Sequence, residues 1–144
     1  MKMKYPKRGP IRYGEDRRIH DAERKTLWRK NNPLKIHARN RTAKSRYQGA
    51  SLRARKTGRE FTISLEKFSE LILLPCSYCG YPLDETGSGL DRMDNSKGYT
   101  LENSTPCCGA CNAAKSHRWT FLEMRDIIGP AIKRVKDLRL SDCH

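Results

Sequence analysis

The chain has 144 residues and a formal net charge of +14, with 36% hydrophobic and 32% charged residues. This length suits one compact domain with an extension, and the longest apolar run, residues 71–74, is far too short to cross a membrane. The first lysines are not followed by the apolar stretch of a secretory leader, so we expect a cytoplasmic protein. In that reducing environment, six cysteines favour a metal site over disulfides.

Positive charge is concentrated in the first part of the chain. Residues 1–60 carry 20 Lys and Arg against 5 Asp and Glu, a charge of +15, whereas residues 61–144 carry 10 against 11. A dense cationic field binds polyanions through phosphate neutralisation and counterion release, and residues 1–60 supply few of the large apolar groups that a membrane surface needs. We therefore predict a basic, mainly helical extension that binds nucleic acid over residues 1–60, and a folded domain over residues 61–144.

Two helical segments are expected within this extension. An arm of Lys, Arg, Pro and Gly over residues 1–15 is followed by residues 16–30, which contain few helix breakers and have Ile19 and Trp28 as apolar anchors. An Asn-Asn-Pro sequence ends this helix, and residues 34–57 favour a second helical run. The basic residues of this run that are candidates for contact with nucleic acid are Arg39, Arg41, Lys44, Arg46, Arg53 and Arg55.

The folded domain is expected to begin with a helix and a pair of strands. Ser64 is a suitable N-cap residue, and apolar residues follow it at helical spacing until Pro75 ends the helix. Residues 88–107 are predicted to form two short strands joined by a loop that turns at Gly98.

Helices are expected after the strands. Residues 109–117 favour a short helix. Thr120 and Glu123 have the spacing of a capping box that begins a further helix. We expect residues 129–130, Gly-Pro, to interrupt that helix before residues 131–139 resume it.

Two C-x-x-C pairs, Cys76 with Cys79 and Cys108 with Cys111, are separated by 28 residues. Two-residue spacing lets both thiolates of a pair reach one tetrahedral Zn²⁺, and two such pairs complete a four-thiolate site. A site closed in this way has no open position for a substrate, so the predicted zinc is structural and any chemistry needs other ligands.

Cys107 competes with Cys108 for this site, because three residues between Cys107 and Cys111 are also compatible with zinc. We prefer Cys108, since it repeats the tight spacing of the first pair. Cys107 is then a buried cysteine of the strand, and Cys143 is a free thiol.

Oxygen ligands lie between the two cysteine pairs. Asp91 is expected near the end of the first strand, Asn103 near the start of the second, and Asn112 on the helix after them. Hard oxygen ligands suit Mg²⁺ or a similar ion, with water and substrate phosphate in the remaining positions. Helical spacing from Cys108 and Cys111 lets Asn112 project past the zinc site toward Asp91.

Residues 89–116, GLDRMDNSKGYTLENSTPCCGACNAAKS, resemble the motif of the HNH (ββα-metal) nucleases, which runs Asp-His, Asn, then C-x-x-C-[HN] with a Lys close behind. They are closer to the subgroup in which Asp-Arg replaces Asp-His, a subgroup that includes a rare-cutting restriction enzyme. The resemblance covers about residues 75–127. It implies an α+β fold with a small ββα-metal core, here stabilised by the four-cysteine zinc site and flanked by the basic extension and C-terminal helices.

The resemblance also implies roles for individual residues. Asp91 and Asn112 would be the ligands of a catalytic Mg²⁺ or Mn²⁺ ion, and Asn103 would brace the loop through backbone hydrogen bonds. Arg92 occupies the position at which most members have the histidine that activates water. Arginine does not lose its proton at usable pH, so Arg92 is expected to contact the scissile phosphate instead.

The group that activates water must then lie elsewhere. Tyr78 is the leading candidate, because members of the subgroup have a tyrosine at the matching place, and Arg92 with the metal could lower its pKa. A packed or phosphate-contacting Tyr78 is the alternative, and His117 is a second candidate for the base. Lys115, Arg118 and His117 are expected to approach DNA on the helix face that carries Asn112.

Together, these features predict a metal-dependent DNA endonuclease that leaves 5′-phosphate and 3′-hydroxyl ends. The expected partner is double-stranded DNA. Proteins of this kind are common in phages and mobile elements, where they are homing or restriction enzymes. If this protein is encoded by a phage, it would act in the cytoplasm of the host cell. Both a homodimer and a monomer remain open. The alternative is a non-catalytic zinc-containing module that binds nucleic acid, with Asp91 and Asn112 as ordinary loop and helix residues.

Overall fold

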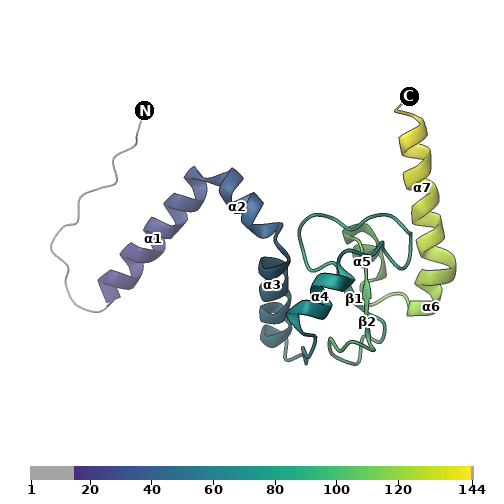
Figure 1. Cartoon of the computed structure of the whole chain (residues 1–144), viewed down its shortest axis with the longest axis horizontal. Coiled ribbons are helices and arrows are strands. Elements are labelled where there is room, and N and C mark those ends of the chain that lie inside the picture. The colour runs from purple at the N-terminus through teal and green to yellow at the C-terminus, as the bar shows by residue number, and fades with distance from the viewer. Residues whose placement is uncertain (1–14, 144) are drawn as a thin grey trace. The chain divides into compact units, whose positions relative to one another are not determined.

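The computed structural model describes residues 15–143, with side chains described from residue 22 onward. The arm expected at the N-terminus and the side chain of Ile19 are therefore not among the residues and side chains that the structure describes. Contacts divide the chain into two compact units, Met1–Ala38 and Arg39–His144, and each is considered by itself. Figure 1 shows the order of the elements along the chain.

The first unit contains α1 (Glu15–Asn31) and most of α2 (Pro33–Asn40), as the sequence predicts. At the end of α1 the Asn32 side-chain amide donates to the Trp28 carbonyl at 2.8 Å, which satisfies one of the last helical carbonyls. Pro33 then begins α2, because its fixed φ suits a first helical position. Residues 22–31 of α1 are all exposed, so this stretch of helix presents charge on every side.

The second unit begins earlier than the boundary expected at residue 60. The helical run predicted over residues 34–57 is two helices, because Thr42 caps a new helix, α3 (Ala43–Lys56), by accepting from the Ser45 amide at 3.2 Å. Charge counting assigns α3 to the extension. Its apolar face instead packs with the second unit, since the Tyr47 ring contacts the ring of Phe68 at a centroid distance of 5.5 Å.

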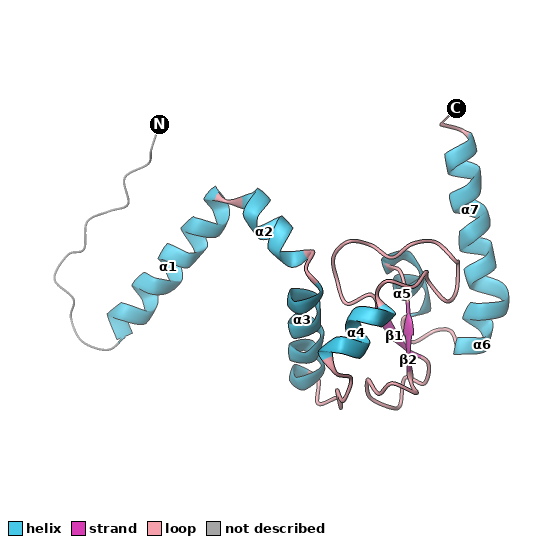
Figure 2. Cartoon of the chain, viewed as in Figure 1, coloured by secondary structure: helices cyan, strands magenta, loops and turns pink. Residues whose placement is uncertain are grey.

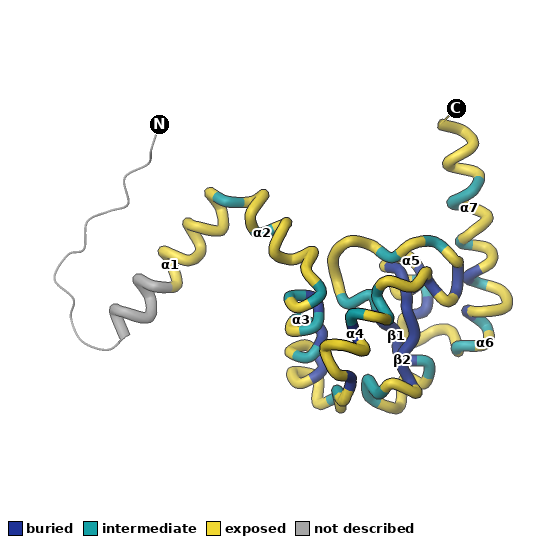
Figure 3. The backbone as a smooth tube through the Cα atoms, viewed as in Figure 1, coloured by how far each residue is buried: buried dark blue, intermediate teal, exposed yellow. Residues whose placement is uncertain are grey.

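The helix α4 (Leu65–Leu71) begins as predicted, with the Ser64 hydroxyl accepting from the Lys67 amide, but it ends at Leu71 and not at Pro75. Phe68 of α4 is fully buried and lies in an apolar cluster with Ile63 and Leu90. This cluster joins α3 and α4 to the strand pair. Figure 3 shows that both strands are coloured as buried along their length.

The strand pair is short and almost entirely buried. Strand β1 (Leu90–Arg92) pairs antiparallel with β2 (Ser104–Pro106), and Asp91 is directly opposite Thr105. Helix α5 (Gly109–Lys115) follows β2 after two residues, so the chain forms the expected strand, strand and helix unit (Figure 2). α5 ends before residue 117 because Ser116 adopts a positive φ of 42°.

Gly98 lets the loop between the strands lie close to the backbone of Glu60. Its φ is not among the positive values of the described glycines, so it is not the turn residue predicted from the sequence. A Cβ at this position would lie 2.6 Å from the Glu60 carbonyl oxygen. The loop backbone therefore runs against residues 60–62, with the Tyr99 amide donating to the Glu60 carbonyl at 2.8 Å.

The C-terminal helices begin with the predicted capping box. The Thr120 hydroxyl accepts from the Glu123 amide, and the Glu123 carboxylate accepts from the Thr120 amide. The predicted interruption at residues 129–130 is wrong. α6 (Phe121–Glu123) passes through a π-helical turn, η1 (Met124–Ile128), into α7 (Gly129–Ser141). The wider turn lets Pro130 enter the first turn of α7, where its missing N–H is not needed.

Gly129 allows α7 to approach the first cysteine pair. A Cβ at residue 129 would lie 2.3 Å from the Tyr78 carbonyl oxygen, and backbone atoms cannot yield as a side chain can. We expect Gly129→Ala to lower the free energy of unfolding by about 2 to 3 kcal/mol, measured by urea denaturation of the full chain. Gly49→Ala in α3 is the control, because its new methyl would meet only the flexible Arg53 side chain. A Gly129→Ala protein as stable as the wild type would contradict this account.

None of the helices described over residues 15–143 is long and apolar enough to cross a membrane.

Candidate metal centres and active site

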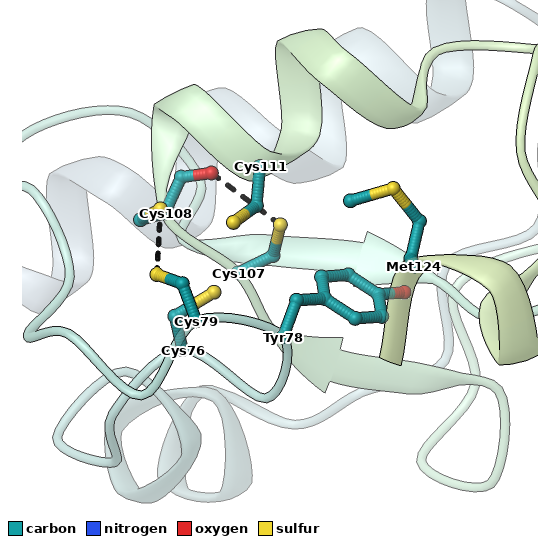
Figure 4. Packing of buried hydrophobic residues seen from close by; sticks show 7 residues of the cluster. All are labelled: Cys76, Tyr78, Cys79, Cys107, Cys108, Cys111 and Met124. Carbon is teal, nitrogen blue, oxygen red and sulfur yellow. Dashed lines mark hydrogen bonds between the residues drawn. The ribbon is translucent and has the colours of Figure 1, made fainter. Parts of the chain in front are cut away.

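Four buried cysteine sulfurs converge between the loop after α4 and the start of α5. The Sγ atoms of Cys76, Cys79, Cys108 and Cys111 all lie within 4.8 Å of one another, and those of Cys79 and Cys108 are 3.7 Å apart (Figure 4). A tetrahedral ion with Zn–S bonds of about 2.3 Å separates its sulfurs by about 3.8 Å. The donor set and its spacing fit this geometry, so the cluster could hold a metal ion such as zinc.

The cluster contains Cys108, the cysteine preferred from the sequence, rather than Cys107. Cys108 is the N-cap residue of α5 and Cys111 lies in its first turn, so both sulfurs face the same side. Cys107 is buried as expected, but its thiol is directed to the Cys108 carbonyl at 3.4 Å. Hydrogen bonds among the buried thiols lower the pKa of Cys76 and raise the pKa of Cys111.

Lys136 of α7 completes the surroundings of the cysteine cluster. Its Nζ lies 3.6 Å from the Cys79 sulfur and 3.5 Å from the Cys108 sulfur, one from each pair, and 4.8 Å from the centre of the Tyr81 ring. A cation at this place offsets negative charge on the thiolates. The sequence offers no local signal for this role, because it depends on how α7 packs against residues far away in the chain.

Asp91 lies beside the cysteine cluster at the middle of β1. Its side chain is only 9% exposed, and its Oδ2 accepts a hydrogen bond from the Tyr78 hydroxyl at 2.6 Å. The same oxygen forms an ion pair with the Lys115 Nζ at 2.9 Å. The structure therefore brings together Asp91 and Tyr78, two residues that the sequence identifies as candidates for one site.

Tyr78 lies inside the first cysteine pair and is buried. Burial above all, followed by the hydrogen bond to Asp91, raises the pKa of the Tyr78 hydroxyl well above its ordinary value. In this arrangement the phenol is a donor to the carboxylate. Arg92 takes no part in the shift of this pKa, because its guanidinium is bound to loop carbonyls. The lowering expected from a bound metal stays a prediction.

The Arg92 side chain is directed to the loop between the strands. Successive residues of a strand face opposite sides, so Asp91 and Arg92 diverge. The Arg92 guanidinium donates to the carbonyls of Asn95 and Lys97 at 2.8 and 2.9 Å, and it lies 5.6 Å from the centre of the Tyr99 ring. It also lines an open pocket together with Arg59 and Lys97.

Lys115 is buried, which corrects the expectation that it approaches DNA. Its side chain is 1% exposed, because α5 directs it inward to Asp91. Its Nζ also donates to the Arg92 carbonyl at 2.5 Å and to the Asn95 side-chain oxygen at 3.2 Å. Lys115 thus links α5 to β1 and to the loop that follows β1.

The two candidate asparagines have different surroundings. The Asn103 side chain accepts from the Asp94 amide at 2.9 Å and donates to the carbonyls of Asp94 and Gly98, which is the bracing role expected for it. Asn112 is exposed on α5, one helical turn before Lys115. The role of Asn112 as a metal ligand stays a prediction.

The basic residues that the sequence singles out are divided between surface and interior. Arg46 is buried, with its Nε donating to the Gly87 carbonyl at 3.0 Å, so it does not present charge to a polyanion as expected. Desolvation lowers the pKa of Arg46. Arg41 pairs with Glu85 at 2.6 Å. The exposed candidates are Arg39, Lys44, Arg53 and Arg55, together with His117 and Arg118, which lie beyond the end of α5.

A two-stranded antiparallel pair followed by a helix, with four clustered cysteines and an acidic residue on the first strand, is an HNH-like fold. Among solved structures, the chain is similar to the rare-cutting HNH restriction endonuclease PacI, whose structure is described as showing an extraordinary mechanism of DNA perturbation. The similarity has a TM-score of 0.58 and 25% sequence identity, and covers 68% of this chain and 81% of the PacI chain.

Sequence comparison adds a viral relative. The chain is 27% identical over 107 residues to the uncharacterized protein R423 of Acanthamoeba polyphaga mimivirus. The match covers 74% of this chain but 20% of R423, so the chain spans about one fifth of that protein's length. No protein-family profile matches the sequence.

Proposed function

We propose that the chain is a metal-dependent DNA endonuclease, of the homing or restriction type, that leaves 5′-phosphate and 3′-hydroxyl ends. The observation that carries the proposal is the hydrogen bond of 2.6 Å between the Tyr78 hydroxyl and the buried Asp91. This pair lies in a fold similar to that of PacI, which is an endonuclease. A carboxylate and a proton-transferring group in contact are what hydrolysis of a phosphodiester needs beside a metal ion.

Asp91 and Asn112 would hold the catalytic ion. Their carboxylate and amide oxygens are hard ligands of the kind that Mg²⁺ and Mn²⁺ prefer, and Mg²⁺ commonly takes only one or two protein ligands beside water and phosphate. When bound, the ion would supply Lewis-acid stabilisation of charge on the phosphate and the leaving oxygen. The four-cysteine cluster would hold a separate, structural zinc.

Tyr78 would act as the base. Its hydroxyl is fixed by Asp91, and as a phenolate it would accept a proton from the attacking water. Its pKa is raised partly by the charge of Asp91, so neutralisation of that charge would make the phenolate more accessible. Asn103 would keep the loop between the strands in place.

Arg92 would bind the DNA backbone rather than transfer a proton. Arg92 lines the same pocket as Arg59 and Lys97, which makes this place cationic. Contact with a backbone phosphate there would orient the DNA next to β1. The exposed arginines and lysines of α1 to α3 would add affinity that falls as salt rises.

A non-catalytic module that binds nucleic acid remains the competing function. The close ion pair of Asp91 with Lys115 favours it, because a buried carboxylate with a balanced charge is also a plain structural feature. Both functions predict DNA binding, so binding does not distinguish them.

Cleavage of supercoiled plasmid DNA with Mg²⁺ or Mn²⁺ tests the proposal. The wild-type chain should cut, and Asp91→Ala and Asn112→Ala should lose cleavage while still binding DNA. Asp94→Ala is the matched control, because this exposed acid lies in the loop after β1 and, among the described residues, its carboxylate pairs with Ser96 and Lys97. Equal cutting by all four proteins, or no cutting of any substrate, would reject the endonuclease.

A further inference from the structure

Lys115 is the most completely buried charged residue among the described side chains, with 1% of its surface exposed. An ammonium group has three N–H donors and is costly to bury unless all of them are used. Here the acceptors are Asp91 Oδ2, the Arg92 carbonyl and the Asn95 side-chain oxygen. The interior around Asp91 is therefore built to receive a cation.

The carboxylate that receives this cation is the one to which we assign the catalytic ion. Asp91 Oδ2 is already bound by two donors, Lys115 and Tyr78, at 2.9 and 2.6 Å. A divalent ion at Asp91 would meet a like charge at close range in a poorly solvated place, where electrostatic repulsion is strong. Either the Lys115 ammonium moves away from Asp91 when the ion binds, or it lowers the affinity of Asp91 for the ion.

We propose that Lys115 is a resident counter-ion of the catalytic site, and that its ammonium and the divalent metal compete for Asp91. The proposal rests on the proposed function, since it needs a metal at Asp91. Lys115 is a positioning residue in this scheme. It holds the Asp91 carboxylate in place without metal, and it limits the affinity for metal in the free protein.

Calorimetric titration of the full chain with Mn²⁺ tests this competition, with Asp91→Asn to subtract binding elsewhere. Lys115→Met should bind Mn²⁺ at Asp91 about tenfold more tightly or better, because the repulsion is gone. It should also melt at a lower temperature than the wild type without Mn²⁺ and recover when Mn²⁺ is added. Lys67→Met, which removes an exposed cation of α4 that pairs with Glu70, should leave Mn²⁺ affinity unchanged.

Two outcomes would overturn the proposal in different ways. If the wild type binds Mn²⁺ through Asp91 and Lys115→Met binds it no more tightly, Lys115 is a structural link alone and the endonuclease is unaffected. If no protein shows binding that depends on Asp91, the metal-dependent function fails as well.

A second measurement keeps the test sharp if Lys115→Met does not fold. The ammonium resonance of Lys115 in the ¹⁵N-labelled wild type, identified by its loss in Lys115→Arg, should shift with the same midpoint as Mg²⁺ binding. No shift at saturating Mg²⁺ would reject the competition.

Discussion

Cys108→Ser should abolish zinc binding and unfold the unit Arg39–His144. Cys108 joins β2 to α5 and contributes one of the four sulfurs that lie within 4.8 Å of one another. Zinc binding to structural sites of this kind is worth about 10–16 kcal/mol, which exceeds the stability of most domains. We expect zinc content well below about one ion per chain, with loss of the cooperative thermal transition in far-UV circular dichroism.

Cys107→Ser is the matched control for this loss. Cys107 is the neighbouring residue and is equally buried, but its sulfur is outside the four-cysteine cluster. It should keep zinc and a cooperative transition, with a loss of about 1 to 3 kcal/mol for the buried hydroxyl. The reverse pattern, with zinc lost from Cys107→Ser and kept by Cys108→Ser, would make Cys107 the ligand.

Features that depend on neighbouring residues could be predicted from the sequence. Ser64 and the pair Thr120 and Glu123 cap their helices because the hydroxyl and carboxylate reach amides only three residues away. The C-x-x-C pairs place their sulfurs together for the same local reason. The strand, loop and helix motif places Asp91 on the first strand, and the structure pairs it with Thr105 of the second.

Features that depend on contacts between residues far apart in the chain could not be predicted from the sequence. From composition alone, Arg46 and Lys115 are two of the positive charges expected at the surface. Both are buried in the structure, because the Gly87 carbonyl accepts from Arg46 and the Asp91 carboxylate pairs with Lys115. Lys136 reaches the cysteine cluster only because η1 and Gly129 let α7 approach Tyr78. No pattern within a few residues of these positions indicates such partners.

The direction of the Arg92 side chain, in contrast, could be predicted from the sequence. Asp91 and Arg92 are adjacent in a predicted strand, and strand geometry alone directs their side chains to opposite sides. The bonds of Arg92 to the loop carbonyls follow from that alternation. A direct effect of Arg92 on the pKa of Tyr78 should therefore not have been expected.

Tyr78→Phe should lower the rate of DNA cleavage by about 10²–10⁴-fold at pH 9, the range that general acid–base catalysis contributes. The base acts as the phenolate, and burial with the Asp91 hydrogen bond raises the pKa of Tyr78 above its ordinary value of about 10. Most of the wild-type protein then carries a neutral phenol at pH 7, and the active fraction grows as pH rises. The wild-type rate should thus increase about tenfold per pH unit between pH 7 and 9, measured in single-turnover assays at saturating metal.

Whether Tyr78→Phe loses this pH dependence shows whether Tyr78 is the base or only a packing residue. If Tyr78 only fills space, Tyr78→Phe keeps the shape of the ring and should preserve both the rate and its slope with pH. If it is the base, the variant should lose both, while thermal melting and Mn²⁺ binding at Asp91 report whether the site is still formed. His117→Ala completes the comparison, because His117 is exposed beyond the end of α5 and is the other candidate. A rate lost in His117→Ala and kept in Tyr78→Phe would transfer the role of base to His117.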